Sequence, residues 1–149
     1  MLSMLIKSCL LFTAALVQSQ SYLDQSITLY ITEPACDSYK CEVQKSTGDK
    51  LKINWLNPPS GNVMIVLEGT TNEPPFTIAK SVPGTTSGCY KGDNGKRPCG
   101  QFIYTLSQKI RSGKYSVAVH SIDHPESVGY TDVIQISNYR KMKRTVLPI

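Results

Sequence analysis

The chain has 149 residues, of which 18% are charged, and its formal net charge is +5 at pH 7. That length suits one domain with a single core. A mild basic excess with scattered cations and no recognisable binding motif does not indicate a nucleic-acid-binding protein, so we expect no nucleic-acid partner.

The first residues predict a secreted protein. Lys7 precedes the uncharged run 8–17, and Val17 and Ser19 supply small residues at the positions that a signal peptidase reads. We expect a signal peptide over 1–19. The run is too short to span a membrane as a helix, although a retained N-terminal anchor is the alternative. No second run of that length follows, so we expect no transmembrane segment.

Seven short segments then show the alternation or the apolar runs of β-strands, most of them bounded by Gly, Pro or Asn. They are 26–31, 51–56, 63–67, 76–82, 101–106, 115–120 and 129–137. No segment outside the signal shows convincing helical periodicity. The spacing predicts an all-β, seven-stranded immunoglobulin or fibronectin type III-like sandwich over 26–138. Residues 44–49 are expected to be a polar connection.

The second of these segments carries the clearest pattern. Leu51, Ile53 and Trp55 alternate with Lys52 and Asn54, which predicts one buried and one wet face. The following Pro-Pro pair cannot continue a strand ladder, so the chain should cross here to the next strand. We expect the Trp55 indole in the core, and an exposed sugar-stacking role is the alternative.

A second local pattern lies at 110–115, where Tyr115 opens a strand after a Ser-Gly-Lys turn. It resembles the tyrosine corner of immunoglobulin and fibronectin type III sandwiches. In that arrangement the Tyr115 hydroxyl bonds a nearby backbone group.

Four cysteines remain after removal of the signal, which carries Cys9. An even number in an oxidising compartment predicts disulfides. The two cysteine-bearing loops should lie at opposite ends of the sandwich, too far apart to be bridged. We therefore predict Cys36 with Cys41 and Cys89 with Cys99. Zinc is the alternative, but neither pair has the spacing of a zinc knuckle.

The loop 89–99 is polar and rich in Gly, so a staple is expected to order it. Such a loop is either a binding feature or a mere insertion. If it binds a partner, it would present Tyr90, Lys91, Lys96 and Arg97, since aromatic and Arg side chains often anchor contacts between proteins.

Catalytic patterns are missing from the sequence. His120 and His124 flank Asp123, but Pro125 and the preceding strand argue against a helical metal pair, so a wet loop is preferred over a weak metal site. There is no nucleophile elbow and no HExxH motif. We expect no enzyme activity, no metal and no cofactor.

The order of residues also resembles a known family. Segments 51–55, 63–69, 77–82, 110–119 and 130–136 look like the secreted fungal Ser/Thr-rich GPI-anchored family, which is similar to the N-terminal domain of yeast cell-wall β-1,6-glucan synthesis proteins. The resemblance implies a fibronectin-like sandwich, no catalytic residues and a role at the cell wall. The chain lacks the family's Ser/Thr-rich stalk and a GPI signal.

The last segment, 139–149, carries four cations and is expected to be a disordered tail, with contact to an acidic surface as the alternative. For the whole chain we expect a secreted, non-enzymatic module of the fungal wall or extracellular matrix that binds polysaccharide or wall protein. The alternative is an effector or inhibitor that binds a host or partner protein through the 89–99 loop. A wall-glycan enzyme is the third hypothesis.

Overall fold

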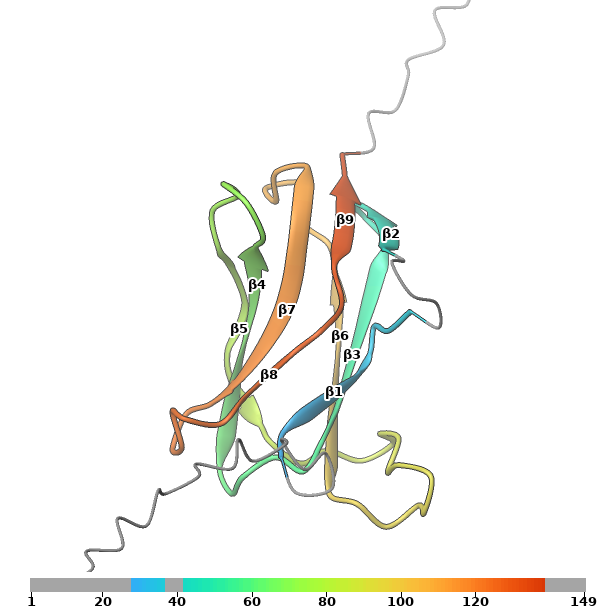
Figure 1. Cartoon of the computed structure of the whole chain (residues 1–149), viewed down its shortest axis with the longest axis vertical. Helices are drawn as coiled ribbons and strands as arrows, with labels where there is room; N and C mark the ends of the chain where they lie inside the picture. Colours follow the sequence, from blue (N-terminus) through green and yellow to red (C-terminus); the bar gives the residue numbers. More distant parts are fainter. Residues whose placement is uncertain (1–27, 37–41, 139–149) are drawn as a thin grey trace, which may run out of the picture.

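The computed structural model describes residues 28–36 and 42–138, which form an all-β fold with no helix (Figure 1). The strands are β1 (Tyr30–Glu33), β2 (Val43–Ser46), β3 (Lys50–Leu56), β4 (Asn62–Gly69), β5 (Phe76–Pro83), β6 (Cys99–Thr105), β7 (Gly113–Ser121), β8 (Val128–Tyr130) and β9 (Ile134–Ser137). The expected signal peptide and basic tail lie outside the described residues.

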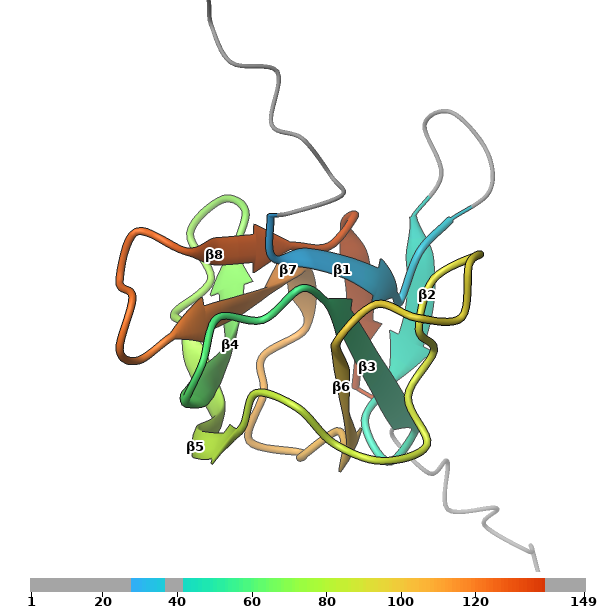
Figure 2. The ribbon, with the colours of Figure 1, turned by 90° about the horizontal axis from the view of Figure 1, so that it is seen from below.

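The strands form two sheets. One has the order β1-β3-β6, and the other has the order β2-β9-β7-β4-β5 with β8 added beside β7. Figure 2 shows the sheets on opposite sides of a shared interior, so the all-β, sandwich-like prediction is confirmed. Strand β4 lies between β5 and β7, in agreement with its almost wholly apolar sequence.

The core lies between the sheets and is supplied by alternate residues of the long strands. Its fully buried members include Leu51, Ile53 and Trp55 of β3, Val63, Ile65 and Leu67 of β4, Val117 and Val119 of β7, and Ile134 and Ile136 of β9. Removing these side chains from water is the main favourable term that holds the sheets together.

The crossing after Trp55 occurs as expected, because β3 and β4 belong to different sheets. Asn57 starts the turn with a φ of 52°, a left-handed conformation that Asn tolerates better than most residues. Its side-chain amide donates to the carbonyl of Thr28 at 3.1 Å, and its backbone N–H donates to the carbonyl of Pro98 at 2.8 Å. The corner is thereby tied to two other loops.

The expectation that 44–49 is a connection is wrong for its first half, because β2 is a strand. It pairs in parallel with β9, from Val43 opposite Ile134 to Ser46 opposite Ser137. The strand lies at the edge of its sheet and buries no side chain fully, so its sequence shows no alternation. Its one apolar residue, Val43, packs partly against the core, and a single such residue in a four-residue strand leaves no periodic signal.

The ends of the expected strands also differ. Of the expected segment 26–31, residues 26 and 27 lie outside the described residues, and residues 28 and 29 are not part of the strand. The first strand runs from Tyr30 to Glu33, two residues beyond the expected segment. The last expected strand is divided at Thr131, whose backbone N–H donates to the Val117 carbonyl at 3.0 Å but whose side chain accepts the return bond. The Val117 N–H donates to the Thr131 hydroxyl at 2.8 Å, where a carbonyl would continue a regular ladder. The described residues therefore form nine strands rather than seven.

Candidate functional site

The connection between β5 and β6, residues 84–98, is the longest one between two strands in the described part of the chain. It crosses from one sheet to the other. Figure 2 shows it passing outside β3 and β6 before it turns back into β6, and Figure 1 shows the same segment at the lower end of these strands. Long ordered loops on a rigid scaffold commonly carry binding functions.

The predicted disulfide between Cys89 and Cys99 is present, with the two Cα atoms 5.9 Å apart. We call residues 89–99 the stapled loop. Cys99 is the first residue of β6, so the bond fixes the loop to the start of a strand. Both cysteines are buried against Leu56 on the outer side of the sheet. Cys41 lies outside the described residues, so its pairing with Cys36 stays a prediction.

Asn54 holds the stapled loop against the sheet. Its side-chain oxygen accepts the backbone N–H of Tyr90 at 2.9 Å, and its amide group donates to the Tyr90 carbonyl at 3.3 Å and to the Thr32 hydroxyl at 2.8 Å. Asn54 is completely buried. The expectation of a wet face at this position is therefore wrong, because the loop covers it.

The tip of the stapled loop is organised by its own backbone. The N–H of Arg97 donates to the carbonyl of Lys91 at 3.0 Å, and the N–H of Gly95 donates to that of Gly92 at 2.9 Å. Gly92 and Gly95 have φ values of 77° and 65°, which only Gly adopts without strain. Backbone hydrogen bonds thus help the disulfide to order the loop, and the amino-acid composition does not reveal them.

A basic hollow lies beside this tip, and we call it the loop hollow. It encloses about 300 Å³. The residues that line it are Thr85, Thr86, Lys91, Gly95, Lys96, Arg97, Pro98 and Cys99. The structure therefore brings together three of the four side chains that the sequence singled out. Ammonium and guanidinium groups around one opening favour an anionic ligand.

Tyr90, the fourth of these residues, does not line the loop hollow. Its ring is exposed, and its hydroxyl donates to the carboxylate of Asp93. This hydrogen bond raises the pKa of the Tyr90 hydroxyl above its ordinary value, since it stabilises the protonated form. Tyr90 thus presents a fixed aromatic surface next to the cations.

Trp55 supports the same region from inside. The indole is completely buried, and its N–H donates to the carbonyl of Gly84 at 2.7 Å, where the connection begins. Gly100 lies against the indole so closely that an added Cβ would fall 2.4 Å from its Cε2 atom. The structure places Trp55 in the core, so the sugar-stacking alternative does not apply to it.

Tyr115 lies at the other end of the sandwich. Its ring is buried, and its hydroxyl donates to the carbonyl of Arg111 at 2.9 Å. This is the bond that the tyrosine-corner pattern predicts. Burial, together with the nearby Glu73 carboxylate, raises the pKa of the Tyr115 hydroxyl.

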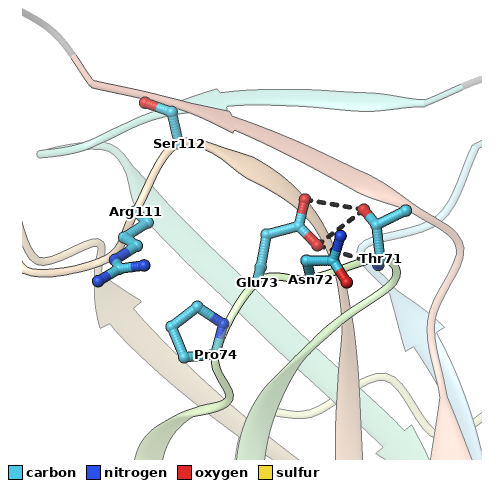
Figure 3. A pocket seen from close by; sticks show the side chains of 6 residues that line it. All are labelled: Thr71, Asn72, Glu73, Pro74, Arg111 and Ser112. Carbon is cyan, nitrogen blue, oxygen red and sulfur yellow. Dashed lines mark hydrogen bonds between the residues drawn. The ribbon is translucent and has the colours of Figure 1, made fainter.

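A second hollow, lined by residues 71–74 with Arg111 and Ser112, adjoins this corner and contains Glu73 (Figure 3). The carboxylate accepts the backbone N–H groups of Lys114 and Thr71, each at 3.0 Å. These bonds, the one from Lys114 foremost, lower its pKa to about 2. In Figure 3 the Arg111 side chain points away from the carboxylate. Glu73 is thus a structural link between the β4–β5 turn and β7.

The histidines do not form a metal site in the described part of the chain. His120 faces Glu68 across two strands, with Nε2 and Oε1 3.1 Å apart, and His124 is 3.8 Å from Glu126. Within residues 28–36 and 42–138 no group of three potential metal ligands comes together.

Fold and site together define a β-sandwich with an ordered, disulfide-stapled basic loop. The chain matches no protein-family model and no curated protein. Among the described residues there is no helix long and apolar enough to cross a membrane.

Proposed function

We propose that this chain is a secreted, non-enzymatic binding module of the fungal cell wall or extracellular matrix. Its stapled loop contacts polysaccharide or a wall protein. The observation that carries the proposal is the pair of hydrogen bonds between buried Asn54 and the backbone of Tyr90, because they hold a polar loop in one conformation. A loop ordered before binding loses less entropy when it meets its ligand.

The fold supports the same proposal. A sheet of order β1-β3-β6 facing a sheet that contains β7, β4 and β5 resembles the arrangement of immunoglobulin and fibronectin type III-like sandwiches, and the Tyr115 bond resembles the tyrosine corner of these domains. We therefore propose membership of this group of folds. Such sandwiches present their binding residues on the loops at one end.

A pull-down tests the proposal. The disulfide-intact chain beginning at residue 20 is mixed with insoluble β-glucan, chitin and whole fungal wall. A loop variant carries Tyr90→Ser, Lys91→Ser, Lys96→Ser and Arg97→Ser. The matched control carries Tyr130→Ser, Lys80→Ser, Lys109→Ser and Arg111→Ser, which removes the same kinds of exposed side chain elsewhere.

We expect wall material to retain the wild-type chain and the control, and to release the loop variant. Equal retention of the loop variant would contradict the assignment of the site. Failure of the wild-type chain to bind any wall material would contradict the wall function.

The second candidate is an effector or inhibitor that binds a host or partner protein through the same loop. It is favoured by the exposed ring of Tyr90 beside Arg97, since these residue types anchor many protein interfaces. Saturable binding to a purified protein, lost in the loop variant while wall binding is absent in the wild type, would select this candidate.

A further inference from the structure

A third hollow lies at the far end of β3 from the loop hollow, and we call it the strand hollow. It encloses about 250 Å³. Its charged lining consists of Lys45, Lys50, Lys52 and Glu33. Lys45 comes from β2 in the other sheet, and its ammonium group lies 3.4 Å from the carbonyl of Lys50. The strand hollow is therefore a second basic opening at the edge of the sandwich.

The outer face of β3 connects the two hollows. Lys50, Lys52 and Asn54 are successive outward positions, and Tyr90 covers the last of them. Outward positions recur about every 7 Å along a strand, so Lys52 lies next to the covered position. The six steps along the strand from Leu56, beneath the loop, to Lys50 span about 20 Å. Figures 1 and 2 place β2 and the stapled loop on the same side of the molecule.

Apolar surface accompanies the cations. Ile103 of β6 pairs with Lys52, and its side chain is 57% exposed, the largest value among the large hydrophobic residues of the described part of the chain. Tyr90 stands at one end of this strip and is 44% exposed. The surface between the two hollows therefore offers both charge and apolar contact.

Charge is unevenly divided over the described residues, which hold ten Lys and Arg and nine Asp and Glu. We call six of the cations the basic track: Lys45, Lys50, Lys52, Lys91, Lys96 and Arg97. Three acids, Glu33, Asp49 and Asp93, accompany them, whereas four cations and six acids lie elsewhere. A nearly neutral domain thus has an excess of cations along the basic track and an excess of acids over its other residues, and this asymmetry orients an approaching polyanion.

The acids of the track are already engaged. Glu33 pairs with Lys52 at 3.1 Å, but both side chains are more than 40% exposed, so the pair is weak and a polyanion can compete for the lysine. Asp93 accepts the hydroxyl of Tyr90, and Asp49 accepts the backbone N–H of Ser46. None of the three closes either hollow.

We propose that the basic track binds one acidic polysaccharide, a chain of sugars bearing carboxylate or sulfate groups, which extends from the loop hollow across Lys52 to the strand hollow. This inference rests on the proposed function and names its ligand class. A span of about 20 Å requires an oligomer rather than a single sugar acid. Its acidic groups meet the two clusters of cations, and its sugar rings contact Ile103 and Tyr90.

The face itself favours a polysaccharide over a peptide. A peptide added as a strand would bond the backbone of an edge strand such as β6, in the plane of the sheet, whereas these cations project from the face of β3, perpendicular to that plane. A ligand on this face must be recognised through side chains. Repeated charge along an extended chain suits that arrangement.

The binding of polygalacturonate and heparin by the disulfide-intact chain from residue 20 tests the proposal, with neutral dextran and polyglutamate as comparison probes. One variant carries Lys50→Ser and Lys52→Ser, which leaves the sequence of the stapled loop unchanged. The matched control carries Lys80→Ser and Lys109→Ser, which lowers the net charge equally. Affinity is measured between about 50 mM and about 200 mM salt, because release of counterions makes polyanion binding steeply salt-dependent.

We expect binding to at least one of the two acidic polysaccharides, no binding to dextran, and an affinity lowered about tenfold by Lys50→Ser with Lys52→Ser but less than about twofold by the control. The double variant should also show a shallower salt dependence, since fewer cations contact the ligand. Polygalacturonate bears carboxylates alone and heparin bears both groups, so comparing the two affinities shows whether sulfate strengthens binding.

Three results would overturn this inference. The first is an equal loss of affinity in the Lys50→Ser, Lys52→Ser variant and in its matched control. The second is binding of polyglutamate as tight as that of the polysaccharides. The third is failure of the wild-type chain to bind either acidic polysaccharide. Each of them leaves the proposed function standing if fungal wall retains the wild-type chain and releases the loop variant. If fungal wall does not retain the wild-type chain, the proposed function itself is wrong.

Discussion

Asn54 and Tyr90 are joined by two hydrogen bonds, of 2.9 and 3.3 Å, between the side-chain amide of the first and the backbone of the second. The Asn54 amide therefore satisfies the backbone N–H and carbonyl of Tyr90, as the backbone of a neighbouring strand would do in a sheet. Because Asn54 is completely buried, the bonds are shielded from water.

Asn54→Ala should lower the free energy of unfolding by about 1–3 kcal/mol, because the backbone groups of Tyr90 lose buried partners. Hydrogen exchange at the Tyr90 amide should accelerate as well. Urea unfolding and exchange measured by NMR check both effects. Asn62→Ala is the control, since Asn62 is exposed and bonds Ser81 on the surface. An unchanged exchange rate at Tyr90 would show that Asn54 does not hold the loop.

Replacing Cys89 and Cys99 together by Ser should cost about 2–3 kcal/mol and leave the fold intact, because the bond joins residues only ten positions apart. Urea unfolding measures the cost. Limited proteolysis should show new cleavage after Lys91 or Lys96 and none in β3. Unfolding of the whole domain would mean that the disulfide is essential to the sandwich itself.

Trp55→Ala should destabilise the protein by about 3–5 kcal/mol, because it empties a fully buried site between the sheets. Trp55→Phe should cost less, since most of the ring volume remains and chiefly the bond to Gly84 is lost. Trp55 is the one Trp of the chain, so circular dichroism rather than fluorescence follows unfolding of the variants. A cost below about 1 kcal/mol for the Ala variant would contradict its burial.

Tyr115→Phe should cost about 0.5–1.5 kcal/mol, the usual net value of one hydrogen bond, here the bond to the carbonyl of Arg111. The corner lies at the opposite end of the sandwich from the stapled loop, so binding to wall material should not change. Thermal unfolding and the pull-down test these statements separately. Loss of binding with unchanged stability would give Tyr115 a functional role instead.

Glu73 should make the stability of the folded protein depend on pH in the acidic range. Its pKa falls from 4.5 to about 2 in the folded protein, so its contribution is fully present above pH 4.5 and is lost as the pH falls through this range. Glu73→Gln should lower the melting temperature near neutral pH, and the difference from wild type should shrink toward pH 2. Glu126→Gln, at a highly exposed site, is the control. A difference independent of pH would exclude the carboxylate charge as its cause.

The sequence predicts the parts of the fold that depend on burial. Alternation at Leu51, Ile53 and Trp55 locates β3, and the Pro-Pro pair locates the crossing to β4. It misses β2, a short edge strand that buries no side chain fully, and the break at Thr131, where a side chain replaces a carbonyl. Neither event changes the hydrophobic period.

The candidate site is predictable in part for a related reason. The composition of 89–99 identifies its cations and its staple, because both are local. The anchoring role of Asn54 depends on a contact across 36 positions, and the alternation around it indicates the opposite environment. Lys45, Lys50 and Lys52 meet through the packing of β2 beside β3, which the sequence does not indicate.

The parallel pairing of β2 with β9 has a mechanical consequence. These strands come from the two ends of the domain, so a pull on β2 toward its N-terminal side and on β9 toward its C-terminal side acts along both strands in opposite directions. The hydrogen bonds between parallel strands are evenly spaced, so they are loaded in shear together rather than opened one after another. In a module under tension between a matrix and another body, this pair would carry the load in shear once β1, which precedes β2 and pairs with β3, had been released.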